Sequence, residues 1–74
     1  MFYWRTKQQL GRALKKKRIE LDFSQEYISL ETAIDRMGLS ALENGVANPT
    51  LFTLLKLCGF LNIKLWRVLR EIDV

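Results

Sequence analysis

Seven basic side chains, with no acidic one among them, lie between residues 5 and 18. The 74 residues carry a net charge of +4, so the rest of the chain is mildly acidic. A block of cations on such a background is typical of proteins that bind a polyanion, although a solvated helix face is the alternative. Membrane-surface attachment is disfavoured because Leu10, Ala13 and Leu14 are needed for the core. The seven are Arg5, Lys7, Arg12, Lys15, Lys16, Lys17 and Arg18.

The sequence contains few residues that could carry out covalent or metal-dependent catalysis. It contains no histidine and one cysteine, Cys58, which excludes zinc fingers, Cys–His pairs and an intramolecular disulfide. The carboxylates show no catalytic pairing, and no phosphate-binding loop is present. We therefore predict a binding protein that is not an enzyme and uses neither a cofactor nor a metal. An unpaired cysteine fits a reducing cytoplasm, and no apolar run is long enough to suggest a membrane span.

Apolar residues recur at helical spacing, and glycine and proline are few. The pattern predicts an all-α fold of five helices, and the length predicts a single domain over residues 1–74. Ser24, Asp35 and Thr50 are expected N-caps, and Gly45 is an expected left-handed C-cap. The helices are expected at about 6–21, 25–32, 36–44, 51–61 and 65–72.

The apolar stripes of these helices predict the core. Arg18 falls inside the first stripe, and a buried guanidinium needs an acidic partner. Cys58 is expected to be a small buried hydrophobe. The other residues expected to point inward are Leu10, Ala13, Leu14, Leu21, Leu39, Leu42, Leu51, Leu54, Leu55, Leu61, Leu65, Trp66, Leu69 and Ile72.

The two short helices at 25–32 and 36–44, joined by a tight turn, form a helix-turn-helix. Their Ser24-Gln25-Glu26 start and Leu42-Glu43-Asn44-Gly45 end resemble the Cro/lambda-repressor-like (XRE-like) family, of the lambdoid phage repressor type. The likeness covers roughly residues 10–70. It implies a five-helix lambda-repressor-like DNA-binding domain, with the helix at 36–44 in the major groove.

The resemblance also implies roles for individual residues. Arg18 pairs with Glu43, and this pair is either purely structural or also reaches a phosphate. The N-terminus of the helix at 25–32 is an anion site, so Gln25 is expected to hold a backbone phosphate, with an ordinary exposed glutamine as the alternative. The expected phosphate contacts are Gln25, Asn44, Arg18 and Lys17, of which Asn44 could instead be a simple C-cap.

Base contacts are implied for the first turns of the helix at 36–44. Arg36 can bridge guanine O6 and N7, and Met37 can contact a thymine methyl group. The alternative for Arg36 is a solvated surface side chain. The implied base contacts are Arg36, Met37, Ser40 and Ala41.

The aromatic residues exceed what a monomer of this size needs, which suggests an interface. Because family members commonly dimerise, we expect a homodimer on a near-palindromic DNA operator, with Trp66, Phe52 and Leu69 at the interface. Alternatively, the aromatic N-terminus (Phe2, Tyr3, Trp4) caps the core, and Trp66 is itself a candidate to fold back into it.

The leading interpretation is a sequence-specific regulator of transcription that binds double-stranded DNA, repressor-like, of the phage or plasmid repressor, antitoxin or restriction–modification controller type. Such a protein would be bacterial or phage-encoded, cytoplasmic and associated with the nucleoid. The alternative is a protein–protein interaction module that keeps the fold without reading DNA. It is motivated by Gly38 inside the reading helix, by Met37, and by a loop after Gly45 without Lys or Arg.

Overall fold

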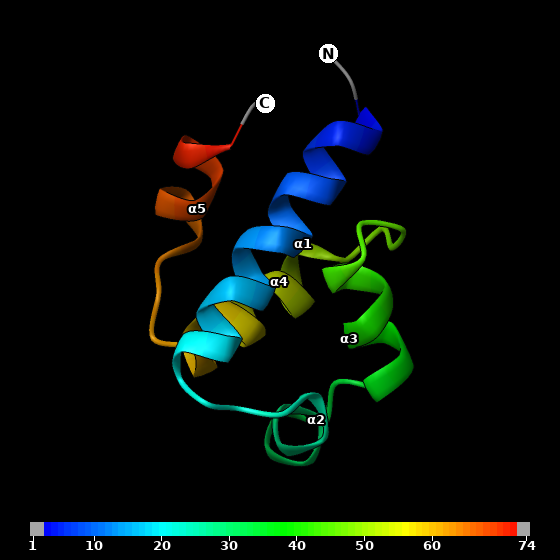
Figure 1. Cartoon of the computed structure of the whole chain (residues 1–74), viewed down its shortest axis with the longest axis vertical. Helices are drawn as coiled ribbons and strands as arrows, with labels where there is room; N and C mark the ends of the chain where they lie inside the picture. The colour runs from blue at the N-terminus through cyan, green and yellow to red at the C-terminus, as the bar shows by residue number, and fades with distance from the viewer. Residues whose placement is uncertain (1–2, 73–74) are drawn as a thin grey trace.

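The computed structural model describes residues 3–72, and within them the chain forms five α-helices and no strand (Figure 1). The all-α prediction is confirmed. Helix α1 begins three residues earlier than predicted, because nothing in residues 3–5 interrupts a helix and no cap marks residue 6 as a start. Four of the helices end one residue earlier than predicted. The helices are α1 (Tyr3–Glu20), α2 (Gln25–Thr32), α3 (Arg36–Glu43), α4 (Leu51–Phe60) and α5 (Leu65–Glu71).

Three helices begin at the predicted N-cap residues. The Ser24 hydroxyl accepts a hydrogen bond from the Tyr27 N–H at 2.9 Å. The Asp35 carboxylate accepts from the Gly38 N–H at 3.1 Å, and the Thr50 hydroxyl accepts from the Thr53 N–H at the same distance. Each bond satisfies a first-turn amide that has no partner within its helix.

Three helices end in the same C-terminal motif. Asp22, Gly45 and Asn62 adopt left-handed conformations, with φ of 60°, 76° and 58°. The next residue in each case donates its N–H to the carbonyl five positions back, at 2.9–3.1 Å. This Schellman arrangement favours Gly, Asn or Asp at the left-handed position. The predicted C-cap at Gly45 is confirmed.

The turn between α2 and α3 places an alanine in the left-handed region, where a residue with a Cβ is uncommon. Ala33 has a φ of 60°, and its N–H donates to the Ser29 carbonyl at 2.9 Å. Hydroxyl groups tie the turn on both sides. The Ser29 hydroxyl donates to the Ile34 carbonyl at 2.6 Å, while the Thr32 hydroxyl accepts from the Ile34 N–H at 3.2 Å. These bonds fix α3 relative to α2.

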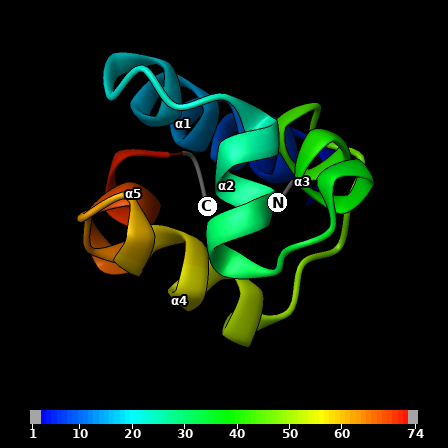
Figure 2. The same cartoon turned by 90° about the horizontal axis from the view of Figure 1, so that it is seen from below.

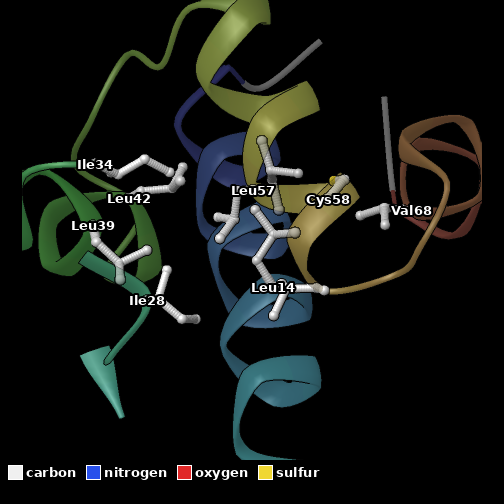
Figure 3. Packing of buried hydrophobic residues seen from close by; sticks show 10 residues of the cluster. Leu14, Ile28, Ile34, Leu39, Leu42, Leu57, Cys58 and Val68 are labelled. Carbon is white, nitrogen blue, oxygen red and sulfur yellow. The ribbon is translucent and has the colours of Figure 1, made fainter. Parts of the chain in front are cut away.

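The core lies where all five helices meet (Figure 3). Leu14 of α1 and Leu57 of α4 lie at its centre, and α5 contributes Val68. Thr32 is buried with its hydroxyl bonded to the Ile28 carbonyl at 2.6 Å. The buried apolar residues are Leu10, Leu14, Ile28, Ile34, Leu39, Leu42, Leu57, Cys58, Leu61 and Val68.

Four residues predicted to be buried are exposed. Leu51 and Leu55 of α4 are exposed, and Leu57 is buried instead. The prediction failed because α4 is apolar on nearly every face, so the sequence pattern does not indicate which face points inward. Leu21 lies beyond the end of α1, where the chain turns away. Trp66 is 55% exposed, and Val68 occupies the inward position on α5.

Of the N-terminal aromatic residues, Tyr3 and Trp4 do not cap the core either. Tyr3 and Trp4 are both more than half exposed, and Phe2 lies outside the described residues. The first turns of α1 lie at the same end of the molecule as α5, near the loop after α3 (Figure 1).

Helix α1 is the central element of the fold. It packs on α3 and on α5, which lie on opposite sides of it (Figure 1). Helix α2 packs on α3 and α4, and the view from below places α2 across the end of the molecule (Figure 2). Within residues 3–72, no helix has the length and apolar character required to cross a bilayer.

Candidate nucleic-acid interface

Helix α3 has one buried face and one exposed face. Leu39 and Leu42 are buried against the core. Arg36 and Met37 are exposed, with Met37 at 81%, and Ser40 is half-buried one turn later. The exposed row follows the i, i+1, i+4 spacing of a single helix face. The structure thus places three of the four residues predicted to contact bases on one outward face. The fourth, Ala41, is half-buried on the same helix.

A charged cluster lies beneath this face. Arg18 Nε is 2.7 Å from Glu43 Oε2, and Arg18 Nη2 is 3.0 Å from Glu43 Oε1. Arg18 Nη1 also donates to the Phe23 carbonyl at 2.7 Å. The two side chains are 12% and 2% exposed, so the pair is almost fully withdrawn from water. This bidentate pair joins the C-terminal half of α1 to the end of α3.

Gln25 belongs to the same cluster, which sequence reasoning did not anticipate. Its Nε2 donates to Glu43 Oε1 at 2.9 Å, and the side chain is half-buried. Glu43 therefore accepts from two helices at once. The bond fixes the Gln25 amide at the N-terminus of α2, where the first-turn N–H groups lack intrahelical partners. The side-chain amide of Gln25 has a second hydrogen that the bond to Glu43 does not use.

The other two predicted phosphate contacts are placed differently. Asn44 follows α3 with an exposed side chain, and its N–H donates to the Ser40 carbonyl at 3.0 Å. Lys17 lies apart from α3. It lines a groove between α1 and α5 together with Ile63 and Lys64. The structure therefore brings Arg18, Gln25 and Asn44 around α3 and separates Lys17 from them.

Residues 14–65 match the family model described as helix-turn-helix, which covers well over half of the chain. The chain belongs to the helix-turn-helix family. It is a DNA-binding regulator and not an enzyme, in agreement with the sequence-based prediction.

Solved structures of a restriction–modification controller protein have the same fold. A mutant of the restriction–modification controller protein C.Esp1396I superposes with a TM-score of 0.76 at 21% identity, covering 95% of this chain and 85% of that one. The tetramer of the same controller in complex with its natural 35 base-pair operator gives a TM-score of 0.76 at 21% identity, covering 95% and 88%. No curated protein matches the chain by sequence.

Two glycines allow α1 to lie close to the end of α3: Gly11, which the sequence analysis passed over, and Gly45, which it expected only as a C-cap. A Cβ added to Gly11 would lie 2.2 Å from the Leu42 carbonyl oxygen, so α1 contacts the end of α3 through backbone atoms. A Cβ on Gly45 would lie 2.7 Å from the Gln8 Cα. Gly11 lies in the middle of a predicted helix, where a glycine lowers helix stability. Such a position often marks close packing, and this signal could have identified Gly11 from the sequence.

The residues predicted at a dimer interface lie on α4 and α5. Phe52 and Trp66 are 71% and 55% exposed, and Leu69 is half-buried. Leu51 and Leu55 add exposed apolar surface on α4. Lys56 lies over the Phe52 ring, while Arg67 and Arg70 both lie over the Trp66 ring.

Within the described residues, no group of histidine, cysteine or acidic side chains is arranged to hold a metal ion. Cys58 is buried on α4, and burial raises the pKa of its thiol. A thiol with a raised pKa is a weak nucleophile at neutral pH, which fits its place in the core.

Proposed function

We propose that this protein is a sequence-specific, repressor-like regulator of transcription that binds double-stranded DNA through the N-terminal half of α3 in the major groove. The observation that carries the proposal is that Arg36, Met37 and Ser40 lie on the outward face of α3, while Glu43 at the end of the same helix is bonded to Arg18 of α1. Arg36 offers two parallel donors to a guanine, and Met37 offers an apolar contact to a thymine methyl group. Ala41 completes the reading face.

Phosphates on either side of the groove are assigned to residues that flank α3. Gln25 would bind one strand at the N-terminus of α2, with its amide orientation fixed by Glu43. Asn44 would bind at the opposite end of α3. Three of the five N–H groups of Arg18 are already used within the protein, so its main role is to hold Glu43, and a phosphate contact is secondary.

We further propose that the protein acts as a homodimer on a near-palindromic operator, with Phe52, Trp66 and Leu69 in the interface. The exposed apolar residues of α4 and α5 support this assembly, and dimers of the fold bind half-sites about one helical turn apart. Among the regulator types considered, the restriction–modification controller receives support from the fold shared with C.Esp1396I. A phage or plasmid repressor and an antitoxin use the same chemistry. Such a regulator would work in the cytoplasm, at the nucleoid.

Selection of binding sites from a random duplex library tests the proposal. We expect a paired motif, bound with a steep inverse dependence on salt. On the selected site, Arg36→Ala should remove the preference at one base pair, at a cost of about 1–3 kcal/mol. Gln25→Ala should weaken selected and random DNA alike. Arg12→Ala, an exposed arginine on another face of α1, is the control and should leave base preference unchanged.

A second candidate function is an interaction module that binds another protein through the α3 surface. Met37 and Val46 are exposed apolar residues next to a loop without charge, and such a surface suits a protein partner. The salt titration separates the two functions. Failure of the wild-type protein to bind duplex DNA even at low salt would favour the interaction module and overturn the proposed reading of DNA.

A further inference from the structure

The first two turns of α1 are attached to the loop that follows α3 (Figure 1). The Tyr3 hydroxyl donates to Asn48 Oδ1 at 2.7 Å, and Lys7 Nζ donates to the same oxygen at 3.3 Å. Lys7 Nζ also lies 4.9 Å from the centroid of the Tyr3 ring. Gln8, which follows Lys7 directly, is packed against Gly45. This attachment exists because α1 begins at Tyr3.

The attachment brings a cation to a loop that has none. Residues 44–50 contain no charged side chain, so α3 ends in a neutral segment. Lys7 supplies a positive charge there from a different element. The partners that the structure gives its ammonium, the Asn48 amide oxygen and the Tyr3 ring, are both neutral. The charge of Lys7 is therefore held in place without being neutralised.

The side chains of Lys7 and Asn48 can still donate hydrogen bonds, whereas the amide oxygen of Asn48 is already used as an acceptor. Asn48 Oδ1 already accepts from two donors, so the amide nitrogen of Asn48 faces away from them. The ammonium of Lys7 has three hydrogens, of which Asn48 takes one. A fixed cation beside outward amide hydrogens is complementary to a phosphate anion.

We infer that Lys7 binds a phosphate of the DNA backbone at the C-terminal end of α3, in place of a cation on the loop itself. Tyr3 and Asn48 are the positioning residues that hold its ammonium there. The inference rests on the proposed function, since it assumes that α3 lies on DNA. It adds a contact from α1 to those from α2 and from Asn44.

A purely structural role for Lys7 makes a different prediction. An ammonium near the last turn of α3 would also be favourable to the helix dipole without any DNA. In that case Lys7 would affect stability and leave the ionic character of binding unchanged. The dependence of affinity on salt therefore distinguishes the two roles, because each phosphate contact contributes about 0.9 to the slope.

The experiment compares variants on the selected duplex over a series of salt concentrations, by fluorescence anisotropy, with thermal melts in parallel. Lys7→Gln should reduce the slope by about 0.9 and weaken binding at physiological salt by about fivefold. Lys7→Arg should have the same slope as the wild-type protein, because arginine keeps the positive charge. Lys64→Gln removes an exposed lysine at the start of α5, on the far side of α1 from α3, and should leave the slope unchanged (Figure 1).

Two results would overturn the inference while leaving the proposed function intact: an unchanged slope in Lys7→Gln, or an equal reduction in Lys64→Gln. Tyr3→Phe gives an independent check, since loss of the hydroxyl should weaken binding and keep the slope. If the wild-type protein failed to bind duplex DNA, the proposed function would fail first, and this inference with it.

Discussion

At the scale of the residue, Glu43 organises the proposed DNA surface. It accepts hydrogen bonds from Arg18 on α1 and from Gln25 on α2 while it ends α3. One carboxylate thus fixes the relative positions of three helices. The sequence indicated that Arg18 needs an acid, and the family resemblance named Glu43. Gln25 was not expected in the cluster, because helical periodicity places residues on faces and says nothing about bonds between elements.

Removing Arg18 should leave the Glu43 carboxylate buried without its cation. We expect Arg18→Met to lower the free energy of unfolding by about 3–5 kcal/mol, because an unpaired buried charge is costly. The double variant Arg18→Met/Glu43→Leu should recover most of this loss. Urea unfolding of both variants measures the difference. Equal stability of the single and double variants would show that the pair is not what holds α1 to α3.

At the scale of the element, the contact of α1 with α3 depends on Gly11. Side chains normally separate two packed helices, whereas here the backbone of α1 lies against the carbonyl oxygens of Leu42 and Glu43. Gly59 in α4 is the opposite case, because a Cβ added there would meet nothing within 4 Å. The two glycines therefore form a matched pair for testing.

We expect Gly11→Ala to destabilise the protein by about 1–3 kcal/mol, since the added methyl group forces the helices apart. Gly59→Ala should stabilise it by about 0.5–1 kcal/mol, because alanine is the better helix former and the site is open. Thermal or urea unfolding checks both signs. A Gly11→Ala protein as stable as wild type would contradict the close contact.

Most helix boundaries could be predicted from the sequence, and the reason is local. The caps at Ser24, Asp35 and Thr50 act on amides three residues away, so their signals are contained in short segments. The sequence before α1 offers no capping residue of the Ser, Thr, Asp or Asn type, and the start of this helix was predicted three residues too late. The inward face of α4 was also missed, because Leu51 and Leu55 are as apolar as the buried Leu57 and only tertiary packing decides between them.

In the candidate site, too, some features could be predicted from the sequence, whereas contacts between distant segments could not. The family resemblance pointed to Arg36 and Met37 on α3, and both side chains are exposed there. Lys17 lies away from the residues around α3, beside Ile63 and Lys64, because the basic block runs around α1 and adjacent basic residues point toward different neighbours. The contact of Lys7 with Asn48 joins residues 41 positions apart, and no pattern within either segment indicates it.

At the scale of the whole molecule, two surfaces lie on different elements. The outward row of α3 is the proposed DNA surface, and the exposed apolar side chains of α4 and α5 form the proposed dimer surface. A regulator that reads a paired site needs both, since its two recognition helices must be held at a fixed separation.

Phe52→Glu should convert the proposed dimer into a monomer by placing a charge in the apolar interface. Sedimentation velocity at micromolar concentration measures the change, and affinity for the paired site should fall by about a hundredfold as the second half-site is lost. Ile19→Glu makes the same chemical change at an exposed position on α1 and should stay dimeric. A dimeric Phe52→Glu protein would place the interface elsewhere.

The glycine contact between α1 and α3 also bears on the thermodynamics of recognition. Main-chain atoms have no rotamers with which to adjust, so the tilt of α3 is set when the chain folds. Preorganisation of this kind removes an ordering cost from the binding step. Affinity for the operator should then come with little conformational entropy loss in the protein.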